Sequence, residues 1–390
     1  MAPPHVIDLG PGYLDPSLLP VDLLARSYAD SLAEYGSAAL AYGDDRGALA
    51  PRAALADRVR QADGVPCDPA NVLVTAGTSH ALHLIATTLA APGDTVLVDQ
   101  SCYDLGRRIL VDCGLRLREI PGDASGMDPD ALDAALTGSR ERVAFLYLIP
   151  TFHNPTGLVV PLERRRALLA VARRHDTLIV EDDAYAGLRL DDASGPPALA
   201  SLAAHRGVIR LCTFSKTLAP GLRLGWLLAE PSLVDRLAGH GLFRSGGCPN
   251  HTTSLAVATL LADGHYDRHL AWLRDRLRQR RDALVNTLAA RLDDGFLLNR
   301  PAGGYFVWLR TRRPERDLLA AAEAAGVWIA AGSRFGGAVG RDVPDRLGRA
   351  APSAVRLAYS LNDPGRLTQA AERLAAAWNA IPDHTRGSGP

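Results

Sequence analysis

The chain has 390 residues, enough for a large domain and a smaller one, and 47% of them are hydrophobic, which predicts a sizeable core. Basic and acidic residues number 43 each, and a net charge of zero argues against binding to nucleic acid or to an anionic membrane. Five scattered cysteines without a CxxC pair argue against a metal or redox site and favour a cytoplasmic protein.

Short apolar segments alternate with helical patterns along the chain, which predicts an α/β fold with a mainly parallel sheet covered by helices. Helices are expected at Ser79–Leu89 and Leu162–Arg174. The expected strands are Val72–Thr75, Thr95–Asp99, Arg116–Ile120, Val143–Ile149, Leu178–Glu181, Ile209–Phe214 and Leu224–Leu228. Ligands of such sheets bind at the carboxyl ends of the strands, so the polar residues that follow the strands are the candidate site.

The first polar segment, Thr75–His80, follows a strand and opens a helix. Backbone N–H groups at a helix start, together with the hydroxyls of Thr78 and Ser79, suit a phosphate group. Ordinary capping of the helix by a hydroxyl side chain explains the same pattern.

Two further segments follow the next strands. Asn154, in Phe152–Gly157, is suited to donate to a phenolate-like oxygen, although Asn-Pro and Thr-Gly are also common in plain turns. Asp182 ends an apolar strand and could keep a pyridine nitrogen protonated, with Tyr185 on the same side of the turn. A solvated acidic loop is the alternative there.

The fourth segment, Thr213–Gly225, contains Lys216, the only lysine of the chain. Arginine replaces lysine everywhere else, but arginine stays protonated and cannot attack a carbonyl as a neutral amine. Thr213, Ser215 and Arg223 lie close to Lys216 in the sequence, which suits an aldehyde cofactor that carries a phosphate.

A long helix is expected at about Tyr266 to Leu292, because leucines recur there at helical spacing. It leads to a smaller C-terminal domain, for which the expected elements are strands near Tyr305–Leu309, Val327–Ala330 and Val355–Ser360 and a helix at Pro364–Trp378. The expected division is an N-terminal arm with part of the small domain (1–45), a large cofactor domain (46–290) and the small domain (291–390). The loop Asp191–Pro197 and the tail Arg386–Pro390 have flexible compositions. No apolar run is long enough for a membrane span.

Together the four segments resemble the class I/II aminotransferases, which are fold type I enzymes dependent on pyridoxal 5′-phosphate (PLP). The resemblance runs from about Tyr42 to Ala375. The run "SKTLAPGLRLGW" and the separation of Asn154 from Asp182 are similar to the branch that includes 2-aminoadipate and kynurenine aminotransferases. It implies a seven-stranded, mainly parallel sheet in the large domain and a smaller α+β C-terminal domain.

The resemblance also implies a role for each candidate residue. Lys216 forms the Schiff base with PLP and moves the substrate proton, Asp182 pairs with the pyridine nitrogen, and Tyr103 stacks on the ring. Asn154 and Tyr185 bind the ring oxygen. The Asn154–Pro155 peptide bond is expected to be cis, which would direct the Asn154 amide at that oxygen. Arg356 binds the substrate α-carboxylate, and Asn154 is expected to contact the substrate as well. The phosphate ligands are Thr78, Ser79, Thr213, Ser215, Arg223 and, from the neighbouring subunit of a homodimer, Tyr42.

The chain departs from the family pattern at Asp99–Tyr103, Arg244–Asn250 and Ala331–Phe335, which leaves the substrate side chain open. Transamination between an α-amino acid and a 2-oxo acid is the leading hypothesis. Another PLP reaction on an amino acid, such as cyclisation, elimination or oxidation, is the nearest alternative. A carrier protein with a dead site or the effector domain of a PLP-dependent regulator is less favoured, because the site residues are complete and the enzyme-like pattern starts near residue 8.

Overall fold

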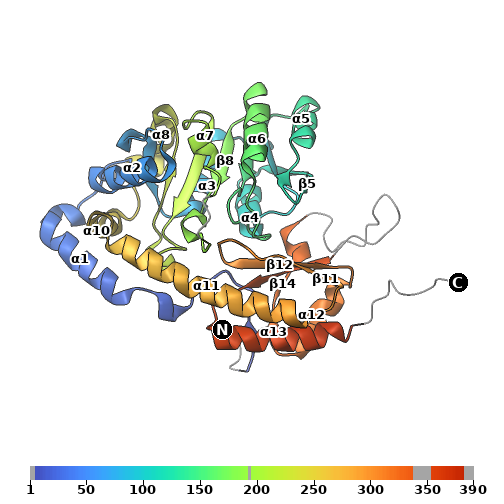
Figure 1. Ribbon diagram of the computed structural model, residues 1–390. Coiled ribbons are helices and arrows are strands. Elements are labelled where there is room, and N and C mark those ends of the chain that lie inside the picture. The colour runs from blue at the N-terminus through green and yellow to red at the C-terminus, as the bar shows by residue number, and fades with distance from the viewer. Residues whose placement is uncertain (1–4, 192–194, 337–352, 382–390) are drawn as a thin grey trace.

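The large sheet has seven strands in the order β2-β10-β9-β8-β7-β3-β4 (Figure 1). The computed structural model describes residues 5–191, 195–336 and 353–381. β10 is antiparallel to both of its neighbours, and every other pair is parallel, which confirms the predicted mainly parallel sheet. The strands are β2 (Val72–Thr75), β3 (Thr95–Asp99), β4 (Arg116–Ile120), β7 (Val143–Leu148), β8 (Ile179–Asp182), β9 (Val208–Thr213) and β10 (Gly225–Leu228).

Successive residues of each central strand enter the cores on opposite faces of this sheet, as side-chain alternation requires. Tyr147 and Val180 belong to the core that includes helix α3 (Thr78–Leu89), whereas Leu146 and Ile179 belong to the core under α5 (Pro129–Thr137), α6 (Leu162–Arg174) and α7 (Leu199–Leu202). Because both faces are covered, strands such as β2, β3 and β7 are apolar almost throughout, which is typical of parallel sheets, whereas the edge strand β4 carries charged residues. α4 (Asp104–Asp112), α2 (Leu49–Asp63), α8 (Pro231–Ala238) and α10 (His251–Ala262) complete the layers.

Helix α11 (His265–Arg291) runs from the large sheet to the C-terminal part of the chain, where it packs on α13 (Pro364–Asn379) (Figure 1). A second sheet of four strands lies there, in the order β11-β12-β15-β14. Its strands are β11 (Phe296–Leu298), β12 (Phe306–Thr311), β14 (Ala330–Ala331) and β15 (Ser353–Ala358), with α12 (Glu315–Ala324) beside α13.

The expected strand Val327–Ala330 is wrong as a single element. The chain forms β13 (Val327–Trp328), which pairs with β1 (Ile7–Asp8), and then β14, which pairs with β15 in the other sheet. The break at Ile329 arises because the two halves pair with strands of different sheets. A local sequence pattern does not indicate which strand will be the partner. The N-terminal segment thereby lies against the C-terminal part of the chain.

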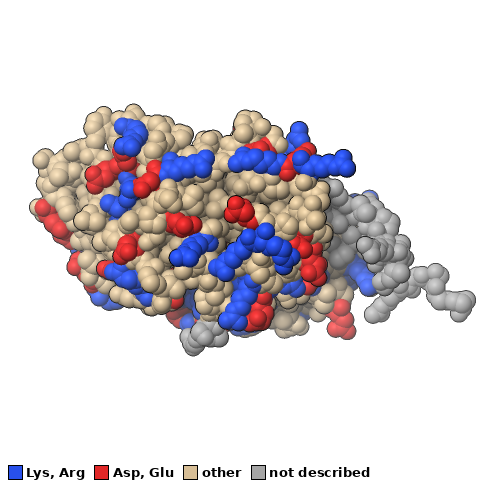
Figure 2. All heavy atoms as spheres, turned by 90° about the horizontal axis from the view of Figure 1, so that it is seen from above, with Lys and Arg blue, Asp and Glu red and all other residues tan. Residues whose placement is uncertain are grey.

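The remaining expected elements differ from the structure mainly by one or two residues at their ends. Residues 192–194 of the expected flexible loop and the tail Arg386–Pro390 lie outside the described residues. Within the described part, no helix is long and apolar enough to cross a membrane. Figure 2 shows basic side chains beside acidic ones over one face, in keeping with the zero net charge.

Candidate active site

A cavity of about 1200 Å³ opens where the carboxyl ends of the large-sheet strands meet the N-terminal segment and the small sheet. Seven of the residues singled out in the sequence line it: Thr78, Tyr103, Asn154, Asp182, Tyr185, Lys216 and Arg356. They come from segments up to 278 positions apart, between Thr78 and Arg356, and the fold brings them together around one cavity.

Lys216 follows β9 and is buried in this cavity. Its Nζ donates a hydrogen bond to the carbonyl oxygen of Gly12 at 3.1 Å, and Tyr305 Oη donates to the Lys216 carbonyl at 2.6 Å. Burial lowers the pKa of the amine to about 8, although Asp182 acts in the opposite direction. A useful fraction of Lys216 is therefore the neutral nucleophile near neutral pH.

Asp182 is the last residue of β8 and is only 5% exposed. Burial raises the pKa of its carboxyl to about 6, while the hydrogen bonds from Tyr147 and the Ala184 N–H lower it. Tyr147 Oη, on the neighbouring strand β7, donates to Asp182 Oδ2 at 2.8 Å. The sequence analysis missed Tyr147, although a tyrosine inside the apolar run Phe145–Ile149 was a signal that a buried acceptor lies nearby.

A group of donors converges beside the start of α3. Gly77 precedes this helix with φ 92°, and no side chain caps it. Thr213 Oγ1 accepts from the Ser215 N–H at 3.0 Å, and Arg223 Nη1 donates to Ser215 Oγ at 3.4 Å. A Cβ atom at residue 77 would lie 3.1 Å from Arg223 Nη2, so glycine permits this close approach.

This donor set fits a phosphate, because free backbone N–H groups, hydroxyls and a guanidinium surround one point at a helix start. Thr78 lines the main cavity directly. Ser79, Thr213, Ser215 and Arg223 are not among the residues that line it. The residues present therefore fit an aldehyde cofactor that carries a phosphate: Lys216 is the nucleophile, Asp182 the carboxylate, and the phosphate ligands lie at the start of α3 beside the cavity.

Arg356, on β15, is the second buried cation of the cavity and is 6% exposed. Nη1 donates to Asn154 Oδ1 at 2.7 Å and Nη2 to the Gly10 carbonyl at 2.6 Å, while the guanidinium lies 4.1 Å from the ring centre of Phe306. Burial lowers the pKa of Arg356 to about 10. Among the described residues, no carboxylate lies within ion-pair distance of Arg356. Arg356 therefore does not form a surface ion pair with any of them.

The aromatic candidates take two different positions. Tyr103 lines the cavity at the start of α4, and burial raises the pKa of its phenol to about 12. Tyr185 is buried with its ring edge-on to Tyr305 at 5.4 Å. Tyr42, by contrast, is 87% exposed and does not line the cavity.

Tyr42 lies against the segment Arg244–Asn250, where the sequence departs from the family pattern. A Cβ atom on Gly246 would lie 3.2 Å from the Tyr42 ring, and the Cys248 N–H donates to the Asp44 carbonyl at 3.0 Å. Arg244 also pairs with Asp45 at 2.9 Å. The predicted cis peptide bond between Asn154 and Pro155 is confirmed.

Comparison with known proteins adds independent findings. The model of the family described as "Aminotransferase class I and II" matches residues 4–374, so the likeness begins well before Tyr42. The chain is 33% identical to aromatic-amino-acid aminotransferase 1 of Thermococcus litoralis, over 85% of this chain and 80% of the other. It is 34% identical to 2-aminoadipate transaminase of Thermus thermophilus, over 78% of this chain and 75% of the other.

The chain is also 32% identical to an uncharacterized HTH-type transcriptional regulator, YisV, of Bacillus subtilis, over 78% of this chain and 61% of the regulator. It thus spans about three fifths of that relative's length. Among solved structures, a multiple substrate aminotransferase from Thermococcus profundus superposes with a TM-score of 0.86 at 28% identity, covering 96% of this chain and 91% of the other. The α-aminoadipate aminotransferase LysN of Thermus thermophilus, complexed with N-(5′-phosphopyridoxyl)-L-leucine, gives a TM-score of 0.82 at 30% identity, covering 97% of this chain and 93% of the other.

Proposed function

Because this chain belongs to the class I and II aminotransferases, the PLP-dependent transferases of fold type I, we propose that it moves an amino group between an α-amino acid and a 2-oxo acid through Lys216. One observation carries the proposal. A single cavity contains a buried lysine with a depressed pKa, a buried carboxylate and a buried arginine, Arg356, without a carboxylate partner among the described residues.

When bound, PLP supplies an aldehyde for the amine of Lys216 and a protonated ring that delocalises the charge left by the departing Cα proton. Asp182 would hold the proton on the ring nitrogen, and Tyr147 orients this carboxylate from β7. Asn154 and Tyr185 would bind the ring oxygen, and Tyr103 would contact the ring. The freed amine of Lys216 would accept the proton from the substrate Cα as a base and then donate it as an acid, for which an amine pKa near 8 is well matched.

The substrate α-carboxylate binds Arg356. Its two Nη atoms reach Asn154 and Gly10, and its planar fork can hold a carboxylate by two parallel hydrogen bonds. Leaving a guanidinium buried without a counter-charge is costly, and an incoming carboxylate removes that cost. This contact fixes the orientation of the Cα–H bond relative to the ring.

The phosphate binds at the start of α3, through Thr78, Ser79, Thr213, Ser215 and Arg223. We propose that Tyr42 completes this site from the other subunit of a homodimer. Its exposure in the single chain supports the idea, as do the exposed apolar residues near it in the sequence and on the adjoining segment, Leu40, Leu49 and Leu242. We also place the protein in the cytoplasm, in keeping with five free cysteines.

The test is a half-reaction. Purified holoenzyme is mixed with single amino acids without any 2-oxo acid, and conversion of the cofactor to pyridoxamine phosphate is followed by absorbance. Aromatic and acidic amino acids belong in the panel, because Tyr13, Trp328, Arg334 and Arg366 line the outer cavity. Transamination predicts full conversion and its reversal by a 2-oxo acid. Release of ammonia, or of a cyclised or oxidised product, with the cofactor unchanged would instead assign another PLP reaction.

A further inference from the structure

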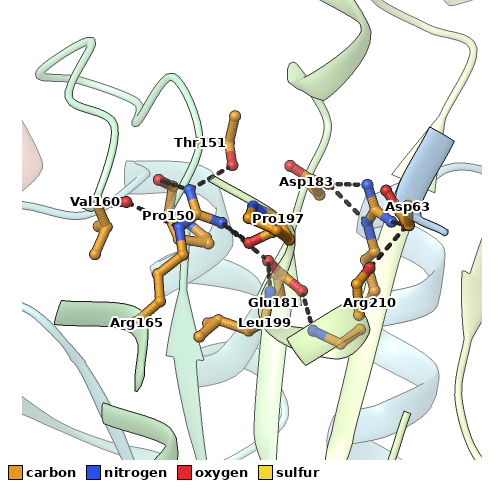
Figure 3. A network of polar contacts seen from close by, with 12 residues as sticks. Asp63, Pro150, Thr151, Val160, Arg165, Glu181, Asp183, Pro197, Leu199 and Arg210 are labelled. Carbon is orange, nitrogen blue, oxygen red and sulfur yellow. Dashed lines mark hydrogen bonds and ion pairs between the residues drawn. The ribbon is translucent and has the colours of Figure 1, made fainter. Parts of the chain in front are cut away.

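On the face of the large sheet opposite the cavity lies a buried polar network (Figure 3). Glu181 and Ile179 project to the face covered by α6 and α7, since alternate residues of a strand share a face, whereas Asp182 projects to the cavity. Arg165 reaches this network from α6 and is completely buried. Neither Arg165 nor Glu181 lines the cavity, so the proposed function gives these two residues no role.

Arg165 makes three hydrogen bonds to a single loop. Nε donates to the Val160 carbonyl at 2.8 Å and Nη2 to the Pro150 carbonyl at 2.8 Å, while Nη2 also donates to Thr151 Oγ1 at 2.9 Å. Residues 150–160 are the loop that carries Asn154. One guanidinium therefore holds both ends of that loop (Figure 3).

The same guanidinium also reaches the strand that carries Asp182. Nη1 lies 3.8 Å from Glu181 Oε1 and donates to the Pro197 carbonyl at 3.2 Å. Glu181 is completely buried, and its two oxygens accept from the Leu199 and Ala200 N–H groups at 2.8 and 2.9 Å. Arg165 thus connects the Asn154 loop to the residue directly before Asp182.

Asp182 also has a support that does not involve Arg165. On its other side, Arg210 binds Asp183 Oδ2 through Nε at 2.7 Å and Asp63 Oδ2 through Nη1 at 2.6 Å. The end of β8 is thereby held by an ion network independent of Arg165 as well as by the sheet (Figure 3). Loss of Arg165 should displace Asn154 more than Asp182.

We propose that Arg165 is a positioning residue, which sets Asn154 relative to Asp182 from behind the sheet and so aligns the ring-oxygen and ring-nitrogen contacts of the cofactor. The inference rests on the proposed function. It extends to the substrate, because Asn154 Oδ1 accepts from Arg356 Nη1 at 2.7 Å, so a shifted loop also loosens the grip on the α-carboxylate. Supporting residues of this kind commonly change affinity by about 10- to 100-fold although they touch no ligand.

The test compares Arg165→Lys, which keeps the charge but cannot span both carbonyls, with Arg313→Met. Arg313 serves as the control: it is also buried, pairs with Asp293 and donates to the Ile381 carbonyl, but it lies in the small domain and does not line the cavity. Each apoprotein is titrated with PLP, and thermal unfolding is recorded beside the pH midpoint of the visible band of bound cofactor. Arg165→Lys should bind PLP about tenfold more weakly, raise that midpoint and raise KM more than it lowers kcat. Arg313→Met should lower only the melting temperature.

Two further variants keep the result decidable if Arg165→Lys folds poorly. The double variant Arg165→Met, Glu181→Gln removes both charges together, so no unpaired ion is left buried. Thr151→Val removes a single contact of Arg165 and should show a smaller effect in the same direction. If the Arg165 variants lose thermal stability but match the wild type in PLP affinity, in the pH midpoint of the visible band and in KM, Arg165 has only a structural role. Failure of the wild type itself to bind PLP would overturn the proposed function instead.

Discussion

At the scale of single residues, Lys216 offers an unusually direct chemical test, because it is the only lysine in the chain. Borohydride reduction of the yellow holoenzyme should attach the cofactor to this one side chain, detectable by mass spectrometry of a tryptic digest. Lys216→Arg should abolish the attachment and the activity, since the guanidinium stays protonated. Only the N-terminal amine would remain, so continued attachment in the variant would disprove the central assignment.

The depressed pKa of Lys216 predicts how cofactor capture depends on pH. The reactive form is the neutral amine, so the rate of PLP capture by apoprotein should rise with pH and level off above about 8 rather than near 10.5. The pKa is lowered on folding, so the folded apoprotein binds fewer protons than the unfolded chain between these values, and its stability should gain as pH rises from about 8 to 10.5. Stopped-flow absorbance after mixing with PLP measures the first effect. A rate still rising steeply above pH 9 would show that the amine is not depressed.

Arg356 is the residue whose replacement should separate substrate binding from cofactor binding. Arg356→Lys keeps a cation but loses the planar fork, so kcat/KM for α-amino acids should fall about 10- to 100-fold, the equivalent of a charged hydrogen bond of about 1.5–3 kcal/mol. PLP affinity should stay within about twofold. The measurement is steady-state kinetics beside a PLP titration. Loss of cofactor with unchanged KM would move the carboxylate site elsewhere.

At the scale of elements, the pairing of β7 with β8 places Tyr147 beside Asp182, with the register Tyr147 to Val180. Tyr147→Phe removes the donor that lowers the Asp182 pKa, so this pKa should rise further above 6. Asp182 must be ionised to hold a protonated ring, so the acid limb of kcat/KM should move to higher pH and kcat should fall about tenfold. The pH profile of the variant is compared with that of Tyr359→Phe.

Tyr359 is a suitable control because it is also buried and donates to the Gly304 carbonyl at 2.7 Å, away from Asp182. Its variant should lose about 1 kcal/mol of stability with an unchanged acid limb. Equal pH profiles for the two variants would show that the Tyr147 hydroxyl does not tune Asp182.

At the scale of the whole molecule, the exposed Tyr42 predicts active sites shared between subunits. Tyr42→Phe and Lys216→Ala proteins, each impaired alone, should regain activity when their subunits are exchanged, because one hybrid site then contains both native residues. The regained activity should approach about a quarter of the wild-type value after random exchange of equal amounts, since half of the dimers then carry one native site of two. Sedimentation of the active enzyme supplies the control. A monomer with full activity would remove Tyr42 from the site.

Much of the candidate site could be read from the sequence because its signals are local. A lone lysine flanked by hydroxyls, an acid at the end of an apolar strand and an Asn-Pro turn stand out in short windows, and parallel strands present their ends at one sheet edge by rule. All seven large-sheet strands were expected within a residue of each end for the same reason, since most strands of such a sheet are short apolar runs.

What only the tertiary structure decided is which residues meet across long separations. Arg356 donates to Asn154 and Gly10, and Tyr147 donates to Asp182. Arg165 binds the loop that carries Asn154. All of these contacts depend on sheet register and helix packing. The shifted pKa values of Lys216 and Asp182 likewise arise from burial, which belongs to the folded molecule and not to the residue. Local chemistry therefore pointed to the candidate reactive groups, and the packing of distant segments determined how those groups are charged and oriented.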